Sequence, residues 1–276
     1  MEKIDSKEVG LELGLRVFKF FLKTEYLHYG YFEKEMPIEI QSLALAQENY
    51  FQLLRTHIPD TVRTLLDVGC GSGKTAYKLM DEGFAVDVVS PGVFLTQYAR
   101  DLMRGKGHIY ASKFEEVQTS TRYDLVLFSE SFQYIPLQES LRKAESLLNP
   151  GGFVMICDFF KKKAEGKSML GGGHDFEVWE NTLSQSPFRV LVEKDITENT
   201  APTIDLVDQF SQQVLRPVMH AGTALAEQRF PMVLKIVRYF YRKKLEKMQA
   251  KHFSGERTGE KFKHFKKYMF YLLQLT

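Results

Sequence analysis

The residues best suited to chemistry in this 276-residue chain are one acid and three glycines in alternation: Asp67, Gly69, Gly71 and Gly73. The apolar run that begins at Thr64 and leads into them is typical of a buried strand in a parallel sheet. A helical pattern follows from Thr75. Glycines at this spacing let the backbone turn sharply and let a ligand approach without meeting a Cβ atom. Because the first N–H groups of the helix would face that ligand, the stretch is predicted to be a binding loop.

Two familiar nucleotide-binding motifs do not fit this loop. A P-loop also ends in Gly-Lys-Thr, as at 73–75, but its first glycine would fall on Val68. A dinucleotide-binding fingerprint would require glycine at the position of Lys74. A glycine-rich turn without a ligand is the remaining alternative. It is disfavoured because such a turn requires neither the acid at the strand end nor three glycines.

The alternation Asp-x-Gly-x-Gly-x-Gly directly after a strand resembles the first motif of class I S-adenosylmethionine (SAM) methyltransferases. Two further segments follow in the order and at the intervals of that family. One is the apolar strand 123–128 with its Ser-Glu end at 129–130, and the other is the Asn-Pro-Gly-Gly turn at 149–152. The stretch 28–32, His-Tyr-Gly-Tyr-Phe, is similar to one in methyltransferases of sterols, tocopherols and quinones.

This resemblance implies an α/β fold with a Rossmann-like, seven-stranded and mostly parallel sheet that carries helices on both faces. It also implies SAM as the cofactor. The chain would divide into four parts: an N-terminal helical lid at 1–60, a SAM-binding core at 61–203, a helical cap inserted at 204–267 and the final strand of the core at 268–276. Within the cap, we expect one helix from Ile204 that ends near Pro217 and a second from Pro231 to about Gln249. The cap is expected to roof the site.

By the same resemblance, the cofactor contacts are the acid and glycines of the loop together with seven other residues: Tyr29, Gln47, Ser90, Pro91, Lys113, Phe114 and Ser129. Two positions depart from the family pattern. Most relatives have an acid at the position of Ser90 that binds both ribose hydroxyls; the serine can accept one such bond, or Asp87 takes the role. No acid precedes Lys113 to bind the adenine amine, so Phe114 is expected to stack on the ring, with a plain core position as the alternative.

The resemblance places the acceptor beside the aromatic stretch and the fourth strand, with four candidate contacts: His28, Tyr31, Phe132 and Tyr134. An aromatic loop packed on the core is the alternative for the aromatic stretch. The candidate catalytic residues are Glu130, Tyr134 and His174. Many relatives have histidine where Tyr134 stands, so an imidazole base is unavailable at that position. His174 lies at a predicted helix start, where a cap or a surface group is the alternative to a base.

Composition and charge narrow the classes of function. The net charge of +2 disfavours a nucleic-acid partner, and the sequence has no Asn-Pro-Pro-Tyr strand end of the kind used on planar nitrogens. No apolar run reaches the roughly 18 residues of a membrane-spanning helix, and the charged N-terminus does not resemble a signal peptide. Cys70 and Cys157 form neither a disulfide framework nor a metal cluster. We therefore expect a cytoplasmic protein without a bound metal.

A basic segment near the C-terminus has a separate interpretation. Ten lysines and arginines and only three glutamates lie within Arg242–Lys267, beside the aromatic residues 239–241. The segment is interpreted as a surface that rests on an anionic membrane or attracts an acidic substrate. A solvated helix face is the alternative.

Together these features predict methyl transfer from SAM to a small, hydrophobic acceptor of isoprenoid, lipid-like or aromatic type. Orientation and exclusion of water supply much of the rate of such a transfer, which agrees with the lack of an obvious catalytic dyad. A SAM-binding partner or regulatory protein without transferase activity is the alternative, because of the departures at Ser90 and Lys113. The sequence leaves open whether oxygen, nitrogen or carbon is methylated.

Overall fold

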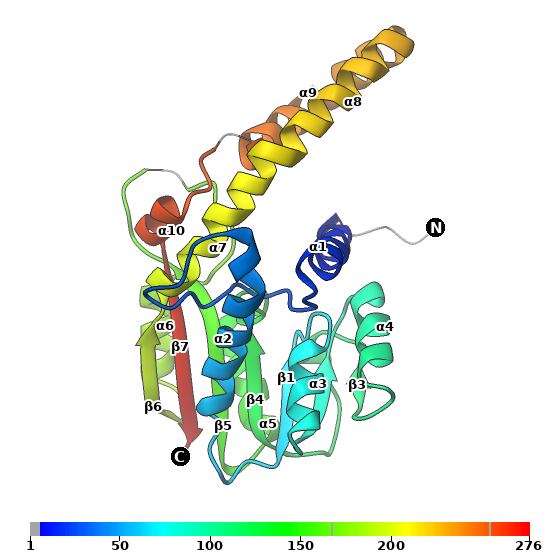
Figure 1. Ribbon diagram of the computed structural model, residues 1–276. Coiled ribbons are helices and arrows are strands. Elements are labelled where there is room, and N and C mark those ends of the chain that lie inside the picture. The colour runs from blue at the N-terminus through cyan, green and yellow to red at the C-terminus, as the bar shows by residue number, and fades with distance from the viewer. Residues whose placement is uncertain (1–5, 167, 254) are drawn as a thin grey trace.

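The computed structural model describes residues 6–166, 168–253 and 255–276, which fold around a single sheet (Figure 1). Seven strands form the sheet: β1 (Thr64–Val68), β2 (Ala85–Val89), β3 (Ile109–Tyr110), β4 (Tyr123–Ser129), β5 (Leu148–Lys161), β6 (Phe188–Asp195) and β7 (Lys266–Leu275). Their spatial order is β3-β2-β1-β4-β5-β7-β6, and β7 runs antiparallel to both of its neighbours. This arrangement confirms the predicted seven-stranded, mostly parallel sheet.

Helices cover both faces of the sheet, and β1 shows why apolar residues stand next to each other in its sequence. Adjacent Leu65 and Leu66 are both fully buried, each in a different core cluster, because successive side chains of a strand point to opposite faces. Five helices contribute to the cluster of Leu65: α2 (Leu43–Thr56), α3 (Lys74–Asp81), α4 (Val93–Leu102), α7 (Thr197–Phe210) and α10 (Gly259–Phe265). Two contribute to the cluster of Leu66: α5 (Leu137–Leu147) and α6 (Phe176–Ser184). Two short 3-10 turns add a buried residue each, η2 (Phe114–Glu116) and η3 (Phe132–Tyr134), whereas a third, η1 (Ile40–Ser42), has none.

The N-terminal helix α1 (Ser6–Leu22) lies at the end of the molecule where the parallel strands have their carboxyl ends (Figure 1). It is joined to α4. Glu8 Oε1 accepts a hydrogen bond of 2.6 Å from the backbone N–H of Phe94, and the Arg16 guanidinium carbon lies 5.6 Å from the centre of the Phe94 ring. The carboxylate of Glu8 thus binds a free N–H in the first turn of α4, where the helix dipole favours negative charge.

The helical insertion between β6 and β7 differs from the expected pair of helices. The first helix does not end near Pro217. Instead α7 continues through a π-helical turn, η4 (Ser211–Leu215), directly into α8 (Arg216–Arg229). The wider turn ends with a hydrogen bond from Arg216 N–H to the carbonyl of Ser211. Pro217 therefore directly follows a turn that is wider than an ordinary α-helical turn. A proline in an ordinary α-helix would clash with the carbonyl four residues earlier.

The second correction concerns what the inserted helices cover. After α8 the chain turns at Phe230 and returns along α9 (Pro231–Phe253). These two helices, the α8–α9 arm, project away from the sheet (Figure 1), and none of the residues of α8 is buried. The roof over the sheet edge is therefore supplied by α7, α10 and the N-terminal segment, rather than by the whole insertion. None of the described helices has the length and apolar character to cross a bilayer.

The basic segment Arg242–Lys267 does not form one surface. Lys266 is only 2% exposed, and its ammonium donates to the carbonyl of Gly172 at 2.6 Å. Lys263 pairs with Glu198 at 3.1 Å. Three basic side chains of the segment are among those that the structure does not describe: Lys244, Lys247 and Lys251. The described members of the segment thus point to different partners; contact of the segment with an anionic membrane stays a prediction.

Candidate cofactor site and active site

The predicted site residues gather where β1, β4 and β5 have their carboxyl ends. These strands are neighbours in the sheet, with Val68 in register with Phe128 and Ser129 in register with Cys157. The glycine loop after β1, Glu130 after β4 and Asp158 near the end of β5 therefore share one edge. Ligands of open α/β sheets bind outside this edge.

The glycine loop needs glycine at each of its three positions. All three have left-handed backbone: Gly69 (φ 73°), Gly71 (φ 56°) and Gly73 (φ 81°). A Cβ on Gly69 would lie 2.4 Å from the Cβ of Ser131, and one on Gly73 would lie 2.9 Å from the Cβ of Ala99. A Cβ on Gly71 would point toward Leu27, at 3.6 Å. The loop is thus packed tightly on two sides and covered by an N-terminal side chain on the third.

Asp67, in the strand that leads into the loop, carries a buried oxygen without a partner. Its side chain is 2% exposed, and Oδ2 has no hydrogen-bond partner among the described residues. Burial raises its pKa to about 7, because a charged carboxylate is poorly solvated there. A ligand that donates a hydrogen bond or carries positive charge would satisfy this oxygen. The residues present here therefore fit the amino-acid end of SAM, and a contact between Asp67 and SAM stays a prediction.

The lid segment, residues 23–32, is tied to the glycine loop through Glu25. The carboxylate accepts hydrogen bonds from the Lys19 ammonium at 2.9 Å and the Tyr98 hydroxyl at 2.7 Å. Lys74, the first residue of α3, lies 3.5 Å from the other carboxylate oxygen. The hydroxyl of Ser72 in the loop donates to the backbone carbonyl of Glu25. Glu25 therefore joins α1, α3, α4 and the lid at one point.

Gln47 holds the lid from the other side. Its Nε2 donates to the carbonyls of His28 at 2.7 Å and Tyr26 at 3.3 Å, and its Oε1 accepts from the Thr24 hydroxyl at 3.0 Å. The side chain is completely buried. The lid backbone and Thr24 thus occupy both ends of the amide. Gln47 therefore positions the lid, in place of the expected contact with the cofactor.

His28 is a neutral histidine inside the lid. Its ring stacks on Tyr50 with 4.1 Å between ring centres, and Nδ1 donates to the carbonyl of Tyr29 at 2.8 Å. Burial lowers its pKa to about 4. Nε2, the acceptor nitrogen of this tautomer, is buried without a partner among the described residues. Tyr31 is half-buried beside the same core, and its backbone N–H binds the carbonyl of Ala46 at 2.7 Å.

Glu130 is the centre of a hydrogen-bond network at the end of β4. The residue has a left-handed backbone with φ 56°, and its Oε1 accepts from the Tyr29 N–H and from the Tyr268 hydroxyl, both at 2.6 Å. The network continues from the Tyr268 hydroxyl to that of Tyr50 at 3.1 Å and on to Ser129 Oγ at 3.2 Å. Burial, together with the nearby Asp158, raises the pKa of Glu130 to about 8.

Asp158 is a second buried acid at this edge, and the sequence analysis did not identify it. It is 1% exposed and accepts from the backbone N–H and the side-chain amide of Gln133, at 3.0 and 2.9 Å. Burial raises its pKa to about 7. Gln133 in turn accepts from Gly173 N–H at 3.1 Å. Its position at the end of an apolar strand could have identified Asp158, whereas nothing in the sequence links Tyr50 or Tyr268 to Glu130.

Two predicted contact residues lie in the core instead. The Phe132 ring is fully buried, with its centre 5.2 Å from that of Trp179 and 5.3 Å from that of Phe128. The Phe114 ring is 2% exposed and meets Phe128 edge to face at 5.2 Å. Phe132 as an acceptor contact and Phe114 as an adenine platform are both corrected. Lys113, predicted beside them, extends into solvent and lies 3.5 Å from Glu116.

The remaining predicted residues stand around the rim. Tyr134 is 67% exposed, and Pro91 is exposed between β2 and α4. His174 Nε2 donates to the carbonyl of Phe132 at 3.0 Å, so Nδ1 is the only ring nitrogen left to act as a base. Ser90 is buried at the end of β2.

Asp87, the alternative to Ser90 for the ribose, has another function in the fold. Its two oxygens accept from the backbone N–H of His108 and from the hydroxyl of Tyr123, both at 2.7 Å. The carboxylate therefore connects β2 to β3 and β4, within the sheet. The contact of Ser90 with the ribose stays a prediction.

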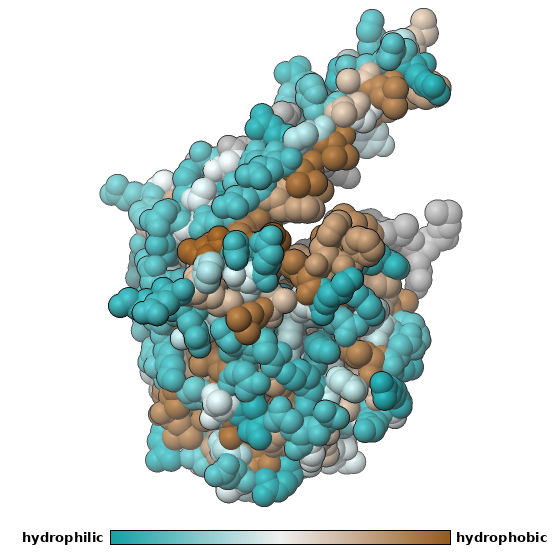
Figure 2. Space-filling model, in the orientation of Figure 1, coloured by the Kyte–Doolittle hydropathy of each residue, from teal (hydrophilic) through white to brown (hydrophobic). Residues whose placement is uncertain are grey.

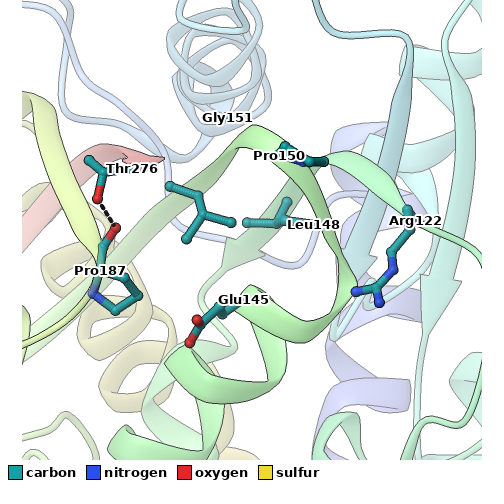
Figure 3. Close-up of a pocket in the computed structure, with 8 residues that line it drawn as sticks. Arg122, Glu145, Leu148, Pro150, Gly151, Pro187 and Thr276 are labelled. Atoms are coloured by element: carbon teal, nitrogen blue, oxygen red, sulfur yellow. Dashed lines mark hydrogen bonds between the residues drawn. The ribbon is translucent and has the colours of Figure 1, made fainter.

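A separate cavity of about 550 Å³ lies at the opposite edge of the sheet (Figure 3). Eight residues line it: Arg122, Glu145, Leu148, Pro150, Gly151, Pro187, Leu275 and Thr276. They stand where β4, β5 and β6 begin and β7 ends. This cavity is therefore remote from the glycine loop and from Glu130. Among the described residues, no group of three or more His, Cys, Asp or Glu side chains is placed to hold a metal ion.

The sequence has recognisable relatives. Residues 41–188, more than half of the chain, match the model of a family described as a methyltransferase domain. The O-methyltransferase cnsE of Penicillium expansum is 25% identical over 204 residues, 66% of this chain and 72% of that protein. The 27-O-demethylrifamycin SV methyltransferase of Amycolatopsis mediterranei (strain S699) is 26% identical over 146 residues, 49% of this chain and 52% of that protein.

Solved structures share the fold at low sequence identity. The [4+2]-cyclase SpnF superposes with a TM-score of 0.70 at 17% identity, covering 97% of this chain and 92% of that one. Geranyl diphosphate C-methyltransferase from Streptomyces coelicolor A3(2), solved with S-adenosyl-L-homocysteine, gives a TM-score of 0.65 at 12% identity, covering 95% of this chain and 92% of that one. At these identities the likeness shows the fold alone.

Proposed function

This chain belongs to the methyltransferase-domain family and is a SAM-dependent small-molecule methyltransferase; from that premise we propose that it methylates an oxygen of a hydrophobic acceptor. The observation that carries the proposal is the pairing of two features at one sheet edge. One is the glycine loop beside the unpartnered oxygen of Asp67, and the other is the buried Glu130 at the neighbouring strand end. Two relatives are named as O-methyltransferases or methylate a 27-O-demethyl compound, which supports oxygen as the accepting atom.

SAM, when bound, supplies a methyl group on a positively charged sulfur. In our proposal, Asp67 and the backbone of the glycine loop hold the amino-acid end. Leu27, the lid residue over Gly71, together with the aromatic side chains Tyr29 and Tyr31, excludes water and provides apolar contact for an isoprenoid, lipid-like or aromatic acceptor. Exclusion of water and alignment of the two reactants are the main sources of rate in such a transfer.

Glu130 is proposed as the group that receives the acceptor's proton. Transfer of the methyl group to an acceptor hydroxyl would form a C–O bond at the expense of the C–S bond, would release S-adenosylhomocysteine as a neutral thioether, and would require the hydroxyl to lose its proton. The hydroxyl proton moves to the Glu130 carboxylate. Two donors, Tyr29 N–H and Tyr268 hydroxyl, fix Oε1 of this side chain, and the pKa of about 8 matches a base that works near neutral pH. Tyr134 and His174 stay predictions for acceptor contact and proton transfer at the rim.

The cofactor site is tested by calorimetric titration of the purified chain with SAM and S-adenosylhomocysteine. Asp67→Ala removes the unpartnered carboxylate, and we expect at least tenfold weaker binding of both ligands. Asp101→Ala, on the exposed side of α4, is the matched control and should bind like the wild type. Absence of binding to the folded wild-type chain would overturn the proposal.

A SAM-binding protein that does not transfer the methyl group is the second candidate. The observation that favours it is the lack of an acid at the position of Ser90 and before Lys113. Conversion of SAM to S-adenosylhomocysteine with any member of a panel of hydrophobic hydroxy compounds would exclude it. Tight SAM binding without turnover on the whole panel would favour it.

A cytoplasmic location is part of the proposal. Cys70 and Cys157 are both free and buried, which is usual in a reducing compartment. No nucleic-acid partner is proposed, because the net charge of +2 offers no general attraction for phosphate.

A further inference from the structure

We propose that the α8–α9 arm docks this protein on the surface of an anionic lipid bilayer. The inference is independent of the acceptor and of methyl transfer, because the arm lies outside the cofactor site. It uses only the part of the basic segment Arg242–Lys267 that lies on α9, together with the rest of the arm. Three features of the arm support it: its exposed apolar face, its charge and its position relative to α1.

The arm exposes large apolar side chains in a continuous row. On α9, Met232, Ile236 and Phe240 recur every four residues and are 80%, 59% and 74% exposed, so they share one helix face. On α8, Val218 and Leu225 are 66% and 58% exposed. Figure 2 shows hydrophobic surface along the side of the arm that faces α1. Apolar patches of this extent on a soluble protein usually mark an interaction site.

The charge of the arm is opposite to that of the remaining chain. Residues 211–253 contain nine Lys and Arg and two Glu, a net charge of +7; since the whole chain carries +2, the remainder carries −5. Both arm glutamates are used within the arm, Glu227 with Arg238 and Glu246 with Arg242. Of the seven other basic residues of the arm, four have described side chains, and all four are exposed: Arg216, Arg229, Lys235 and Lys243.

Three kinds of partner could cover the arm: a second copy of the chain, a nucleic acid or an anionic bilayer. The combination of exposed apolar side chains and positive charge favours one of them. A second copy of the arm would cover the apolar face, but it would bring two charges of +7 together. A nucleic acid would match the charge but would leave Met232 and Ile236 against a hydrated phosphate backbone. An anionic bilayer accepts both: apolar side chains enter the interface and lysines and arginines meet the lipid headgroups.

Helix α1 offers a second apolar contact at the same end of the molecule. Phe20 and Phe21 are 69% and 68% exposed, and Figure 2 shows hydrophobic surface on α1 across an open gap from the arm. Both elements stand at the carboxyl end of the sheet, above the glycine loop (Figure 1). A bilayer touching both would lie over the candidate active site, so a hydrophobic acceptor could enter without crossing water.

The test is co-sedimentation of the full chain with vesicles of phosphatidylcholine alone or mixed with phosphatidylserine. We expect binding to the mixed vesicles, weak binding to the neutral ones and loss of binding in high salt. The charge variant Lys235→Glu/Lys243→Glu should bind the anionic vesicles at least twenty-fold more weakly, at about fivefold per charge neutralised. Its control, Lys106→Glu/Arg122→Glu, makes the same change of charge on exposed parts of the body and should bind like the wild type.

A second variant tests the apolar contribution. Met232→Ser/Ile236→Ser/Phe240→Ser should also lose vesicle binding, whereas Val178→Ser/Val190→Ser, exposed on the body at 54% and 40%, should not. All of these side chains are exposed, so circular dichroism and the thermal midpoint should be unchanged. Equal binding to neutral and anionic vesicles would overturn the proposal. The proposal would also be overturned if the wild type did not bind vesicles and instead formed a dimer in sedimentation velocity that the triple variant does not form.

Discussion

At the scale of single residues, the candidate site combines three buried acids whose protons are held unusually tightly. Burial raises the pKa of Asp67 and of Asp158 to about 7 and that of Glu130 to about 8. Their surroundings differ. Asp158 is held by three donors from Gln133 and Phe159, Glu130 by two, and Asp67 Oδ2 by none among the described residues. The least satisfied acid is the one expected to receive the cofactor, and the intermediate one is expected to receive a proton.

The pH dependence of catalysis follows from Glu130. A base acts in its deprotonated form, so kcat/KM should rise with pH through about 8 and then level off. In Glu130→Gln the rise should disappear, and the rate should fall by about a hundredfold, the lower end of the range for general-base catalysis. SAM binding should persist in this variant, and Glu139→Gln, on the exposed side of α5, should keep the wild-type profile. A Glu130→Gln enzyme with an unchanged rate would show that Glu130 is not the base.

Sequence reasoning found the residues of this site that follow from local pattern. Asp67 and the glycines stand out because their spacing imposes a turn, and Glu130 because it ends an apolar strand. Tyr268 could not be found, since it lies 138 residues from Glu130 along the chain and only the antiparallel return of β7 brings it there. Phe132 was misassigned because periodicity does not tell which side of a single 3-10 turn faces the core.

At the scale of elements, the lid depends on one carboxylate. Glu25 accepts hydrogen bonds from Lys19 and Tyr98 and lies beside Lys74. Burial by itself would raise the pKa of Glu25, but its partners, with the hydrogen bond from Lys19 first among them, outweigh burial and lower the pKa. Removing the charge should therefore loosen α1 and the lid together without affecting the sheet.

Glu25→Gln tests this dependence. We expect faster amide hydrogen exchange in residues 19–28 and faster release of SAM, by several-fold, with little change in the unfolding midpoint. Glu12→Gln removes the exposed pair with Arg16 on the same helix and should change neither, since exposed pairs contribute little. Unaltered exchange of the lid in Glu25→Gln would show that other contacts close it.

The elements were predictable where apolar runs or glycine turns define them, and less so beyond the sheet. The central strands β1, β2 and β4 are short and mostly apolar segments, so the centre of the sheet could be predicted from the sequence. The continuous helix through Pro217 could not, because proline normally ends a helix and the π-helical turn that accommodates it has no simple sequence signal. The direction of the arm depends on that turn and was missed for the same reason.

At the scale of the whole molecule, the buried acids make stability depend on pH. Their folded-state pKa values lie above the ordinary values of about 4, so the folded chain keeps protons that the unfolded chain releases. The stabilisation is complete below about pH 4 and is lost as pH rises to about 8. His28, with its pKa lowered to about 4, acts in the opposite direction, but only below about pH 6.5.

We therefore expect the free energy of unfolding to fall between pH 6.5 and pH 8, where His28 makes no contribution. Glu130 alone should account for about 1.6 kcal/mol of the fall. Urea unfolding at the two pH values measures it. Glu130→Gln should show a smaller fall than the wild type, with Glu139→Gln as the control. A wild-type chain equally stable at both pH values would contradict the pKa values assigned to the three acids.

The π-helical turn η4 also determines which way the faces of the following helix point around its axis. Each residue advances an α-helix by about 100° around its axis, so the one-residue difference between a π turn and an α turn rotates everything that follows it. A chain shortened by one residue at Gln213, with Pro217→Ala to permit a regular helix, would keep the composition and charge of α9. The apolar row on the arm would nevertheless turn by about a quarter of a circle, away from the side that α1 shares.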